Sequence, residues 1–140
     1  MDKPIITESS IKIPSSQEFL VDVDGFLEGR LVKHGVDKGV IADIAISVTE
    51  IVNNAIVHGN KSVFEKAVTV EIKAENSEVE IVITDEGDGF DPHNIKSPIE
   101  DDNLLKEVGR GIFITRALMD KVDIDSGPGR PTRVTLSKHI

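Results

Sequence analysis

Residues 47–60 read SVTEIVNNAIVHGN, and this stretch combines a helical apolar pattern with a line of polar side chains. Its apolar residues recur every three or four positions, which predicts a helix with one buried face. Glu50, Asn54 and His58 follow one another at intervals of four residues, so they lie one turn apart on another side of that helix. Two glycine-rich turns further along the chain could hold a nucleotide against this polar strip.

The composition indicates a single globular domain over residues 1–140. Hydrophobic residues make up 39% of the chain, Trp and Tyr are absent, and Phe occurs 5 times, so the core is expected to be aliphatic. Cysteine is also absent, which excludes a disulfide, a thiolate nucleophile and a cysteine-based metal site.

The net charge of -9, from 16 basic and 25 acidic residues, argues against direct nucleic-acid binding. Proteins that bind nucleic acid need a basic surface to displace counterions from the phosphates. A single nucleotide is still compatible with this charge, because a magnesium ion and backbone N–H groups can offset its phosphates. The N-terminus has no apolar signal-peptide core, and no apolar run reaches the ~18–20 residues that span a bilayer. We therefore expect a cytoplasmic protein without a membrane contact.

Apolar periodicity predicts helices that are segregated from a mostly antiparallel sheet. Ser15 and Glu18 have the form of a capping box for the first helix, and Asp37 is placed to cap the second. Residues 90–108 lack periodicity, as lids and binding loops often do. The predicted strands are 5–13, 67–73, 78–84, 121–125 and 132–138, and the predicted helices are 16–34, 38–59 and 111–120. This order predicts an α+β fold, a two-layer sandwich.

Asp85, Gly87 and Gly89 follow directly on a predicted buried strand. The carboxylate could accept a hydrogen bond from an exocyclic amine such as adenine N6, while the glycines let the backbone approach the base. The alternative is a glycine-rich turn that the aspartate caps. A calcium loop of the EF-hand type is excluded by its spacing, because Gly87 takes the third position and Lys96 the twelfth.

Gly109, Arg110 and Gly111 are predicted to begin the helix that follows the long loop. The free N–H groups of a helix N-terminus bind phosphate, and an arginine adds charge-assisted hydrogen bonds. The alternative is a flexible helix start without a ligand.

Glu50 and Asn54 have the chemistry of a phosphate-transfer site. An amide oxygen is a suitable magnesium ligand, and a carboxylate one turn earlier can orient or deprotonate a nucleophile. The alternative is a solvated helix face. The histidines show no zinc-ligand spacing, and His58 is left without a role.

In this order, the motifs resemble the N, G1 and G2 boxes of the Bergerat-fold ATPases, the superfamily of gyrase, histidine kinases and MutL. The N box lies in residues 50–59, the G1 box in 85–89 and the G2 box in 109–111, and residues 132–136 resemble the last strand. Residues 54–59, 89–92 and 117–120 are most similar to the small bacterial anti-sigma-factor serine/threonine kinases. The resemblance covers nearly the whole chain and implies the histidine-kinase-like ATPase fold.

This resemblance implies a role for each motif in binding ATP and Mg²⁺. Asn54 is expected to coordinate the metal, and Glu50 to act as the general base toward a partner's serine. Asp85 is expected to hold the adenine amine, with the remaining contacts from Gly87, Gly89 and Thr132 near the base and from Gly109, Arg110 and Gly111 at the phosphates. Residues 90–108 are expected to form the ATP lid.

The implied function is that of an anti-sigma factor and protein serine kinase in a partner-switching pathway. Such a protein sequesters a sigma factor, or phosphorylates a serine of an anti-anti-sigma protein and releases it, and it is expected to form a homodimer. The alternative is an ATP-binding switch that sequesters a partner without kinase activity. No histidine-kinase dimerisation helix precedes the predicted domain, so a complete two-component sensor is not expected.

Overall fold

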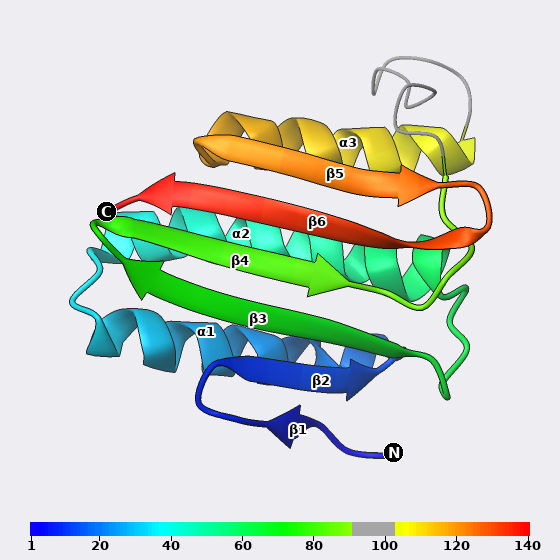
Figure 1. Ribbon diagram of the computed structural model, residues 1–140, viewed down its shortest axis with the longest axis horizontal. Helices are drawn as coiled ribbons and strands as arrows, with labels where there is room; N and C mark the ends of the chain where they lie inside the picture. Colours follow the sequence, from blue (N-terminus) through cyan, green and yellow to red (C-terminus); the bar gives the residue numbers. More distant parts are fainter. Residues whose placement is uncertain (91–102) are drawn as a thin grey trace.

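A computed structural model describes residues 1–90 and 103–140 of the protein, with side chains in the second part from Glu107 onward. Six strands form one sheet in the order β1-β2-β3-β4-β6-β5, and every neighbouring pair is antiparallel. Figure 1 shows the three long helices together on one face of this sheet. The predicted α+β two-layer sandwich is therefore confirmed.

The elements follow the predicted order closely along the chain. Most of the predicted loop at 90–108 lies outside the described residues. The strands are β1 (Ile5–Ile6), β2 (Ser10–Pro14), β3 (Ala67–Glu75), β4 (Glu78–Thr84), β5 (Lys121–Gly127) and β6 (Arg130–His139). The helices are η1 (Gln17–Phe19), α1 (Leu20–Lys33), α2 (Lys38–Asn54), the π-helical turn η2 (Ala55–Gly59) and α3 (Asn103–Leu118).

The core lies between the sheet and the helices and is aliphatic apart from Phe26 among the described residues. The residues that the apolar periodicity predicts to be buried form this core. Their burial removes apolar surface from water, and this drives the packing of the two layers. The buried positions include Val23, Leu27 and Leu31 of α1, Ile44, Val48 and Ile51 of α2, and Val79, Ile81 and Ile83 of β4.

Helix α2 is the central helix of this layer and packs against both α1 and α3. The Asp37 side chain accepts a hydrogen bond from the Gly39 N–H at 3.1 Å, so the predicted N-cap is confirmed. By length and composition Lys38–Gly59 is apolar enough to cross a membrane, with a mean hydropathy of 1.6. Val48 and Val52 are nevertheless fully buried in the core, as expected for the central helix of a globular domain.

Two details near the N-terminus differ from the prediction. The single strand at 5–13 is instead the hairpin β1–β2, which turns at a hydrogen bond from Thr7 N–H to the Ser10 carbonyl. The capping box is wrong, because Ser16 is the N-cap of η1 and has no side-chain cap bond. Ser15 is buried and its hydroxyl donates to the carbonyl of Lys66, so it links the end of β2 to the start of β3.

Asn60 joins three segments at the end of the sheet where α2 and η2 finish. It is fully buried, and its Nδ2 donates to Ser15 Oγ at 2.8 Å and to the Ala67 carbonyl at 3.0 Å. Its Oδ1 accepts the Glu86 N–H at 2.8 Å. The loop after β4 is therefore fixed to the ends of β2 and η2 by one side chain whose hydrogen bonds are satisfied.

Asn60→Ala is expected to lower the free energy of unfolding by about 2–4 kcal/mol, because it leaves buried partners without hydrogen bonds. Urea unfolding of the purified protein measures this change. Asn53→Ala is the matched control, since Asn53 accepts only from the exposed Gln17 side chain among the described hydrogen bonds, and it should change stability by less than about 0.5 kcal/mol. Equal effects of the two substitutions would contradict the role of Asn60.

Candidate functional site

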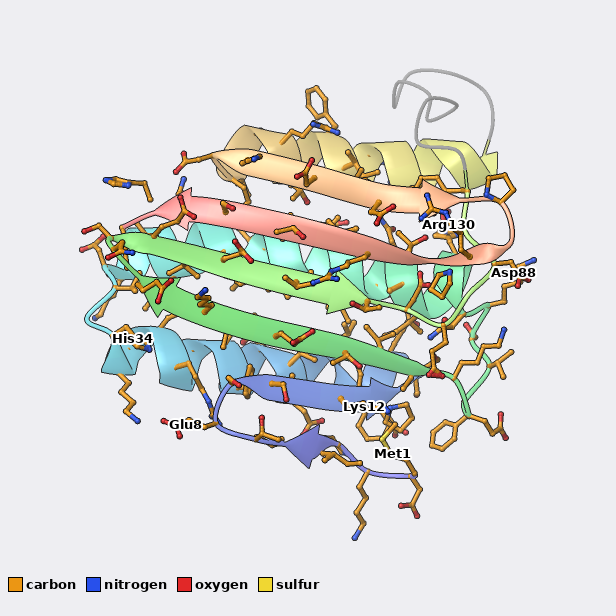
Figure 2. The ribbon with its side chains drawn as sticks, in the orientation of Figure 1. Met1, Glu8, Lys12, His34, Asp88 and Arg130 are labelled. Carbon is orange, nitrogen blue, oxygen red and sulfur yellow. The ribbon has the colours of Figure 1, made fainter. Side chains whose placement is uncertain are left out.

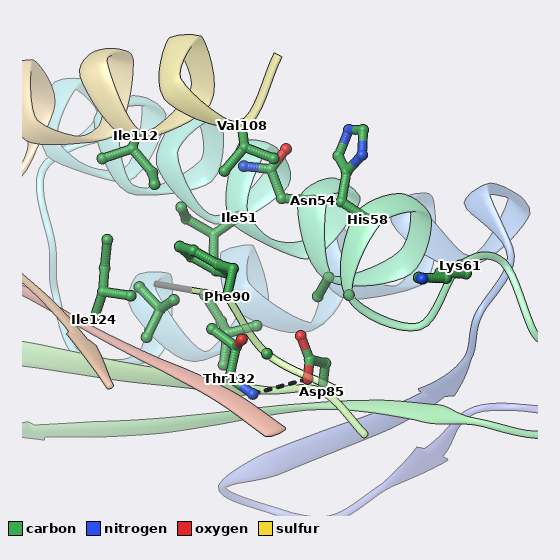
Figure 3. Close-up of a pocket in the computed structure, with 15 residues that line it drawn as sticks. Ile51, Asn54, His58, Lys61, Asp85, Phe90, Val108, Ile112, Ile124 and Thr132 are labelled. Carbon is green, nitrogen blue, oxygen red and sulfur yellow. Dashed lines mark hydrogen bonds between the residues drawn. The ribbon is translucent and has the colours of Figure 1, made fainter. Parts of the chain in front are cut away.

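A cavity of about 230 Å³ opens between the end of α2, the sheet and α3. Figure 3 shows α2 and α3 along one side of it and the ends of β4 and β6 along the other. Most of its wall is aliphatic, from residues that include Ile51, Ala55, Ile83, Ile112, Ile124 and Val134. Such a slot, with few polar groups, is suited to a flat organic ligand.

Four of the predicted site residues line this cavity, namely Asn54, Asp85, Gly89 and Thr132. They come from the end of α2, from the loop after β4 and from the start of β6. The sequence therefore identified residues that the fold brings together from distant positions. Phe90, His58 and Lys61 also line the cavity. Phe90 begins the predicted lid, whereas no ligand role was predicted for His58 or Lys61.

Asp85 lies directly after β4 and is 4% exposed. Its Oδ1 accepts the Gly87 N–H at 3.0 Å and the Thr132 N–H at 2.9 Å. The Asp85 N–H donates in turn to the Thr132 carbonyl at 3.0 Å. The described hydrogen bonds to this carboxylate all end on Oδ1, so Oδ2 remains available to accept a hydrogen bond from a ligand.

The glycines of this loop allow the backbone segments to approach one another. A Cβ on Gly87 would lie 2.0 Å from the Gly59 carbonyl oxygen, and a Cβ on Gly59 would lie 2.1 Å from Asp85 Oδ2. Gly89 has φ +77°, and its added Cβ would lie 2.1 Å from the Gly127 carbonyl oxygen. Any side chain at these positions would separate the end of η2 from the loop that carries Asp85.

The β5–β6 hairpin closes the sheet side of the cavity. The Thr132 hydroxyl lies 2.7 Å from Ser126 Oγ, which accepts the Phe90 N–H at 2.9 Å. The Gly129 N–H donates to the Asp88 carbonyl at 2.7 Å, and Figure 2 shows Asp88 at the same end of the sheet as this hairpin. Ser126 was not predicted, because a serine in a strand that ends in a glycine turn has no distinctive sequence signal.

Asn54 and Glu50 lie beneath α3, where a glycine permits close contact. A Cβ on Gly111 would lie 2.9 Å from Asn54 Nδ2 and 3.2 Å from Glu50 Oε2. Both side chains are half-buried. Asn54 faces the cavity, whereas Glu50 lies one turn earlier in α2 and is not part of the cavity wall.

The predicted helix start at Gly111 is wrong. Helix α3 begins at Asn103, so Gly109, Arg110 and Gly111 lie inside it, where backbone N–H groups bond to the helix's own carbonyls. Gly109 and Gly111 are buried and Arg110 is exposed. Two glycines so close together are typical of a helix break, but here the buried stripe of Val108, Ile112, Thr115 and Met119 continues through them. Close packing on α2 offsets the cost of glycine in a helix, about 1 kcal/mol.

His58 belongs to η2 and its side chain is 13% exposed. Its Nε2 lies 3.2 Å from Oε2 of Glu107 on α3. Its Nδ1 is buried and has no hydrogen-bond partner among the described residues. The side chain thus joins the end of the α2–η2 helix to α3 beside the cavity.

Apart from Lys61, the polar side chains of the cavity fall into two sets. Asp85 and Thr132 offer acceptors and a hydroxyl on the sheet side, while Asn54 and His58 lie on the helix side (Figure 3). Among the described residues no three His, Asp or Glu side chains form a metal cluster. A magnesium ion here would therefore take Asn54 as a protein ligand and complete its shell with ligand oxygens and water, as is usual for this ion.

The comparisons with known proteins agree with this geometry. The model of the histidine kinase-like ATPase domain family matches residues 13–138. A serine-protein kinase RsbW from Staphylococcus aureus is 31% identical over 137 residues, which cover 93% of this chain and 85% of that protein. RsbW from Staphylococcus aureus strain MRSA252 is 30% identical over the same length.

Two solved structures show the same fold. The RsbU and RsbW domains of a Mycobacterium tuberculosis protein superpose with a TM-score of 0.66 at 22% identity, covering 97% of this chain and 31% of that one. The histidine kinase domain of a blue-light activated histidine kinase from Erythrobacter litoralis superposes with a TM-score of 0.55 at 20% identity. The match covers 71% of this chain and 44% of that one. This chain therefore corresponds to less than half of either solved chain.

Gly87→Ala is expected to destabilise the protein by about 1–3 kcal/mol, because its Cβ must displace the Gly59 carbonyl. Gly29→Ala is the matched control, since a Cβ there has nothing within 4 Å. It should raise the free energy of unfolding by about 0.5–1 kcal/mol, as alanine does in an exposed helix. Urea denaturation measures both, and a neutral Gly87→Ala would argue against the tight approach.

Proposed function

The chain belongs to the family of histidine kinase-like ATPase domains and to its branch of RsbW serine-protein kinases, and from this premise we propose that it binds ATP with Mg²⁺ and transfers the terminal phosphoryl group to a serine of a partner protein. The observation that carries the proposal is the Asp85 carboxylate, which is buried, fixed through Oδ1 and open at Oδ2. A fixed acceptor at the end of an aliphatic slot is suited to the exocyclic amine of adenine.

The base would lie between the aliphatic residues of the helix side and those of the sheet. Ile51 and Ala55 contribute one wall, and Ile83 and Val134 the other. Asp85 Oδ2 accepts the hydrogen bond from the amine, and Thr132 holds the Asp85 loop in place through its backbone N–H. Asp85 is 4% exposed, and this burial strengthens its hydrogen bonds.

Asn54 would hold the metal on the helix side of the cavity. Its amide oxygen is a hard ligand, and no cysteine competes for a softer metal. Mg²⁺, when bound, neutralises phosphate charge. Gly109, Arg110 and Gly111 remain a prediction as phosphate-side residues, supported by the position of Gly111 against the Asn54 amide.

Glu50 would act as the general base. It is half-buried one helical turn before Asn54 and lies beside Gly111, so its carboxylate is near the phosphate side without entering the adenine slot. The partner's serine oxygen forms the new bond to phosphorus, its proton passes to Glu50, and ADP leaves.

The proposed partners are an anti-anti-sigma protein, which carries the serine, and a sigma factor that the protein sequesters in the cytoplasm. A phosphoserine carries roughly -1.5 to -2 charges, and this chain has a net charge of -9, so the product would be repelled after transfer. We further propose that the protein acts as a homodimer.

Glu50→Gln is expected to reduce phosphoryl transfer to the serine-bearing partner by about 100-fold or more, because the general base is lost. Its affinity for ATP should stay within about threefold of the wild type, since Glu50 does not line the cavity. Transfer from labelled ATP and isothermal titration calorimetry measure the two effects. Transfer that persists in Glu50→Gln would contradict the base assignment, and absence of transfer by the wild type would favour a binding-only switch.

Asp85→Asn is expected to weaken ATP binding by at least about 30-fold, because the amide cannot replace both acceptor functions of the carboxylate. The shift in Tm produced by saturating Mg²⁺-ATP reports this loss. Asp123→Asn is the control, since Asp123 is exposed on β5 and should leave the shift unchanged. An unchanged shift in Asp85→Asn would contradict the adenine assignment.

A further inference from the structure

The outer face of α3 carries exposed side chains that take no part in the core. Helix α3 packs against α2 and β5, and Figure 1 shows it at the margin of the helix layer. Its inward residues Val108 and Ile112 line the cavity. Phe113, Arg116 and Ala117 lie on the other side of the helix and are exposed. This side of α3 has no covering element in the part of the chain that the structure describes.

Phe113 is the most exposed aromatic residue of those described. Its exposed fraction is 63%, and that of the next, Phe64, is 38%. Phe64 also has an aromatic neighbour, because its ring lies 6.4 Å from that of Phe19, whereas Phe113 has none within the described residues. A single exposed apolar side chain is ordinary on a protein surface. Phe113 therefore carries an inference only together with its charged neighbours.

The arginine next to Phe113 is not used to hold the fold together. Arg30 donates to two carbonyls of the β1–β2 turn, and Arg130 donates to the Asp125 carboxylate. Arg116, by contrast, forms neither an ion pair nor a hydrogen bond with any residue that the structure describes. Its guanidinium is therefore open to an acceptor from another molecule.

The acidic residues near the two ends of this face already have partners. Glu107 lies against His58, and Asp120, just after α3, accepts the His139 N–H at 2.6 Å. The centre of the face therefore carries the positive charge of Arg116, on a chain whose net charge is -9. A cationic and aromatic surface on an acidic chain is complementary to an acidic partner.

Helical spacing brings these side chains into one compact surface. Phe113 lies three residues before Arg116 and four before Ala117, so the three are neighbours on the helix. Arg110, whose proposed place is at the phosphates, adds charge at the edge, about 9 Å before Arg116 along the axis. We call Phe113, Arg116 and Ala117 the α3 surface. Aromatic and arginine side chains are enriched at the energetic centres of protein interfaces.

We propose that the α3 surface is a docking site for an acidic amphipathic helix of a partner protein. An apolar residue of that helix packs on Phe113 and Ala117, and a carboxylate one turn away forms a bidentate pair with the Arg116 guanidinium. Helices that dock in this way present their anchors at intervals of three or four residues. The inference goes beyond the proposed function and does not depend on nucleotide binding in the cavity.

Other occupants fit the α3 surface less well. In a two-fold contact between two copies of this chain the same patch meets itself, which would bring two arginines together. A nucleic acid or an anionic membrane carries many more negative charges than one helix, so the net charge of -9 opposes these partners more strongly.

Binding of two synthetic helical peptides of ~18 residues, about 27 Å long, tests the inference. Both carry a leucine stripe, which is bordered by glutamates in the first peptide and by lysines in the second. Fluorescence anisotropy of the labelled peptides at low salt gives the dissociation constants. The wild-type protein should bind the glutamate peptide, and Phe113→Ala should weaken this binding by at least about 10-fold, because the apolar anchor is lost.

A pair of charge reversals separates the α3 surface from general electrostatics. Arg116→Glu should weaken binding of the glutamate peptide by at least about 10-fold, and it should bind the lysine peptide more tightly than its control does. Arg133→Glu is the matched control, since it makes the same change in net charge at an exposed position of β6, and it should stay within about threefold of the wild type. All three substituted residues are exposed, so the variants should unfold at the urea concentration of the wild type.

Several results would overturn the inference. These are absence of glutamate-peptide binding by the wild type below about 1 mM, unchanged affinity in Phe113→Ala, and equal losses in Arg116→Glu and Arg133→Glu. Sedimentation velocity and binding to phosphatidylglycerol vesicles examine the other occupants. An oligomer that dissociates in Phe113→Ala would assign the α3 surface to a second copy, and vesicle binding that Phe113→Ala abolishes would assign it to a membrane.

Discussion

The site depends on the contact between the end of η2 and the loop after β4. The Gly59 carbonyl lies where a Cβ of Gly87 would be, and the Asp85 carboxylate lies where a Cβ of Gly59 would be. This contact joins the helix layer to the sheet layer at one end of the molecule. Asp85 can be buried and fixed by backbone N–H groups only because two glycines allow the segments to meet. Asn60 stabilises the same junction through its hydrogen bonds to Ala67 and Glu86.

Helix α3 completes the cavity by a second glycine contact. Gly111 packs over Asn54 and Glu50, and Val108 and Ile112 cover the aliphatic slot. The polar strip of α2 therefore lies between two layers rather than in open solvent. Glu50, Asn54 and His58 therefore all lie close to α3, while the opposite face of the same helix forms the core.

The sequence predicted the fold well wherever periodicity and capping are local properties. The apolar stripes of α1 and α2, the Asp37 cap and the β3–β4 hairpin all follow from neighbouring residues, and the motif residues Asn54, Asp85, Gly89 and Thr132 meet in one cavity. The errors arose where tertiary contacts decide. Gly109 and Gly111 are tolerated in a helix because α2 lies close to α3 at this point. Ser15 forms hydrogen bonds with the Lys66 carbonyl and the Asn60 side chain instead of capping a helix. Asn60 and Ser126 were missed because their partners are remote in sequence.

Calorimetry of the wild-type protein with Mg²⁺-ATP and Mg²⁺-GTP most directly tests the proposal that Asp85 selects the base of the nucleotide. In the proposed site adenine would present an amine to Asp85 Oδ2, whereas guanine would present a carbonyl oxygen at the same ring position, which would leave two acceptors facing each other. We expect ATP to bind at least about 100-fold more tightly than GTP. Equal affinities for the two nucleotides would contradict it.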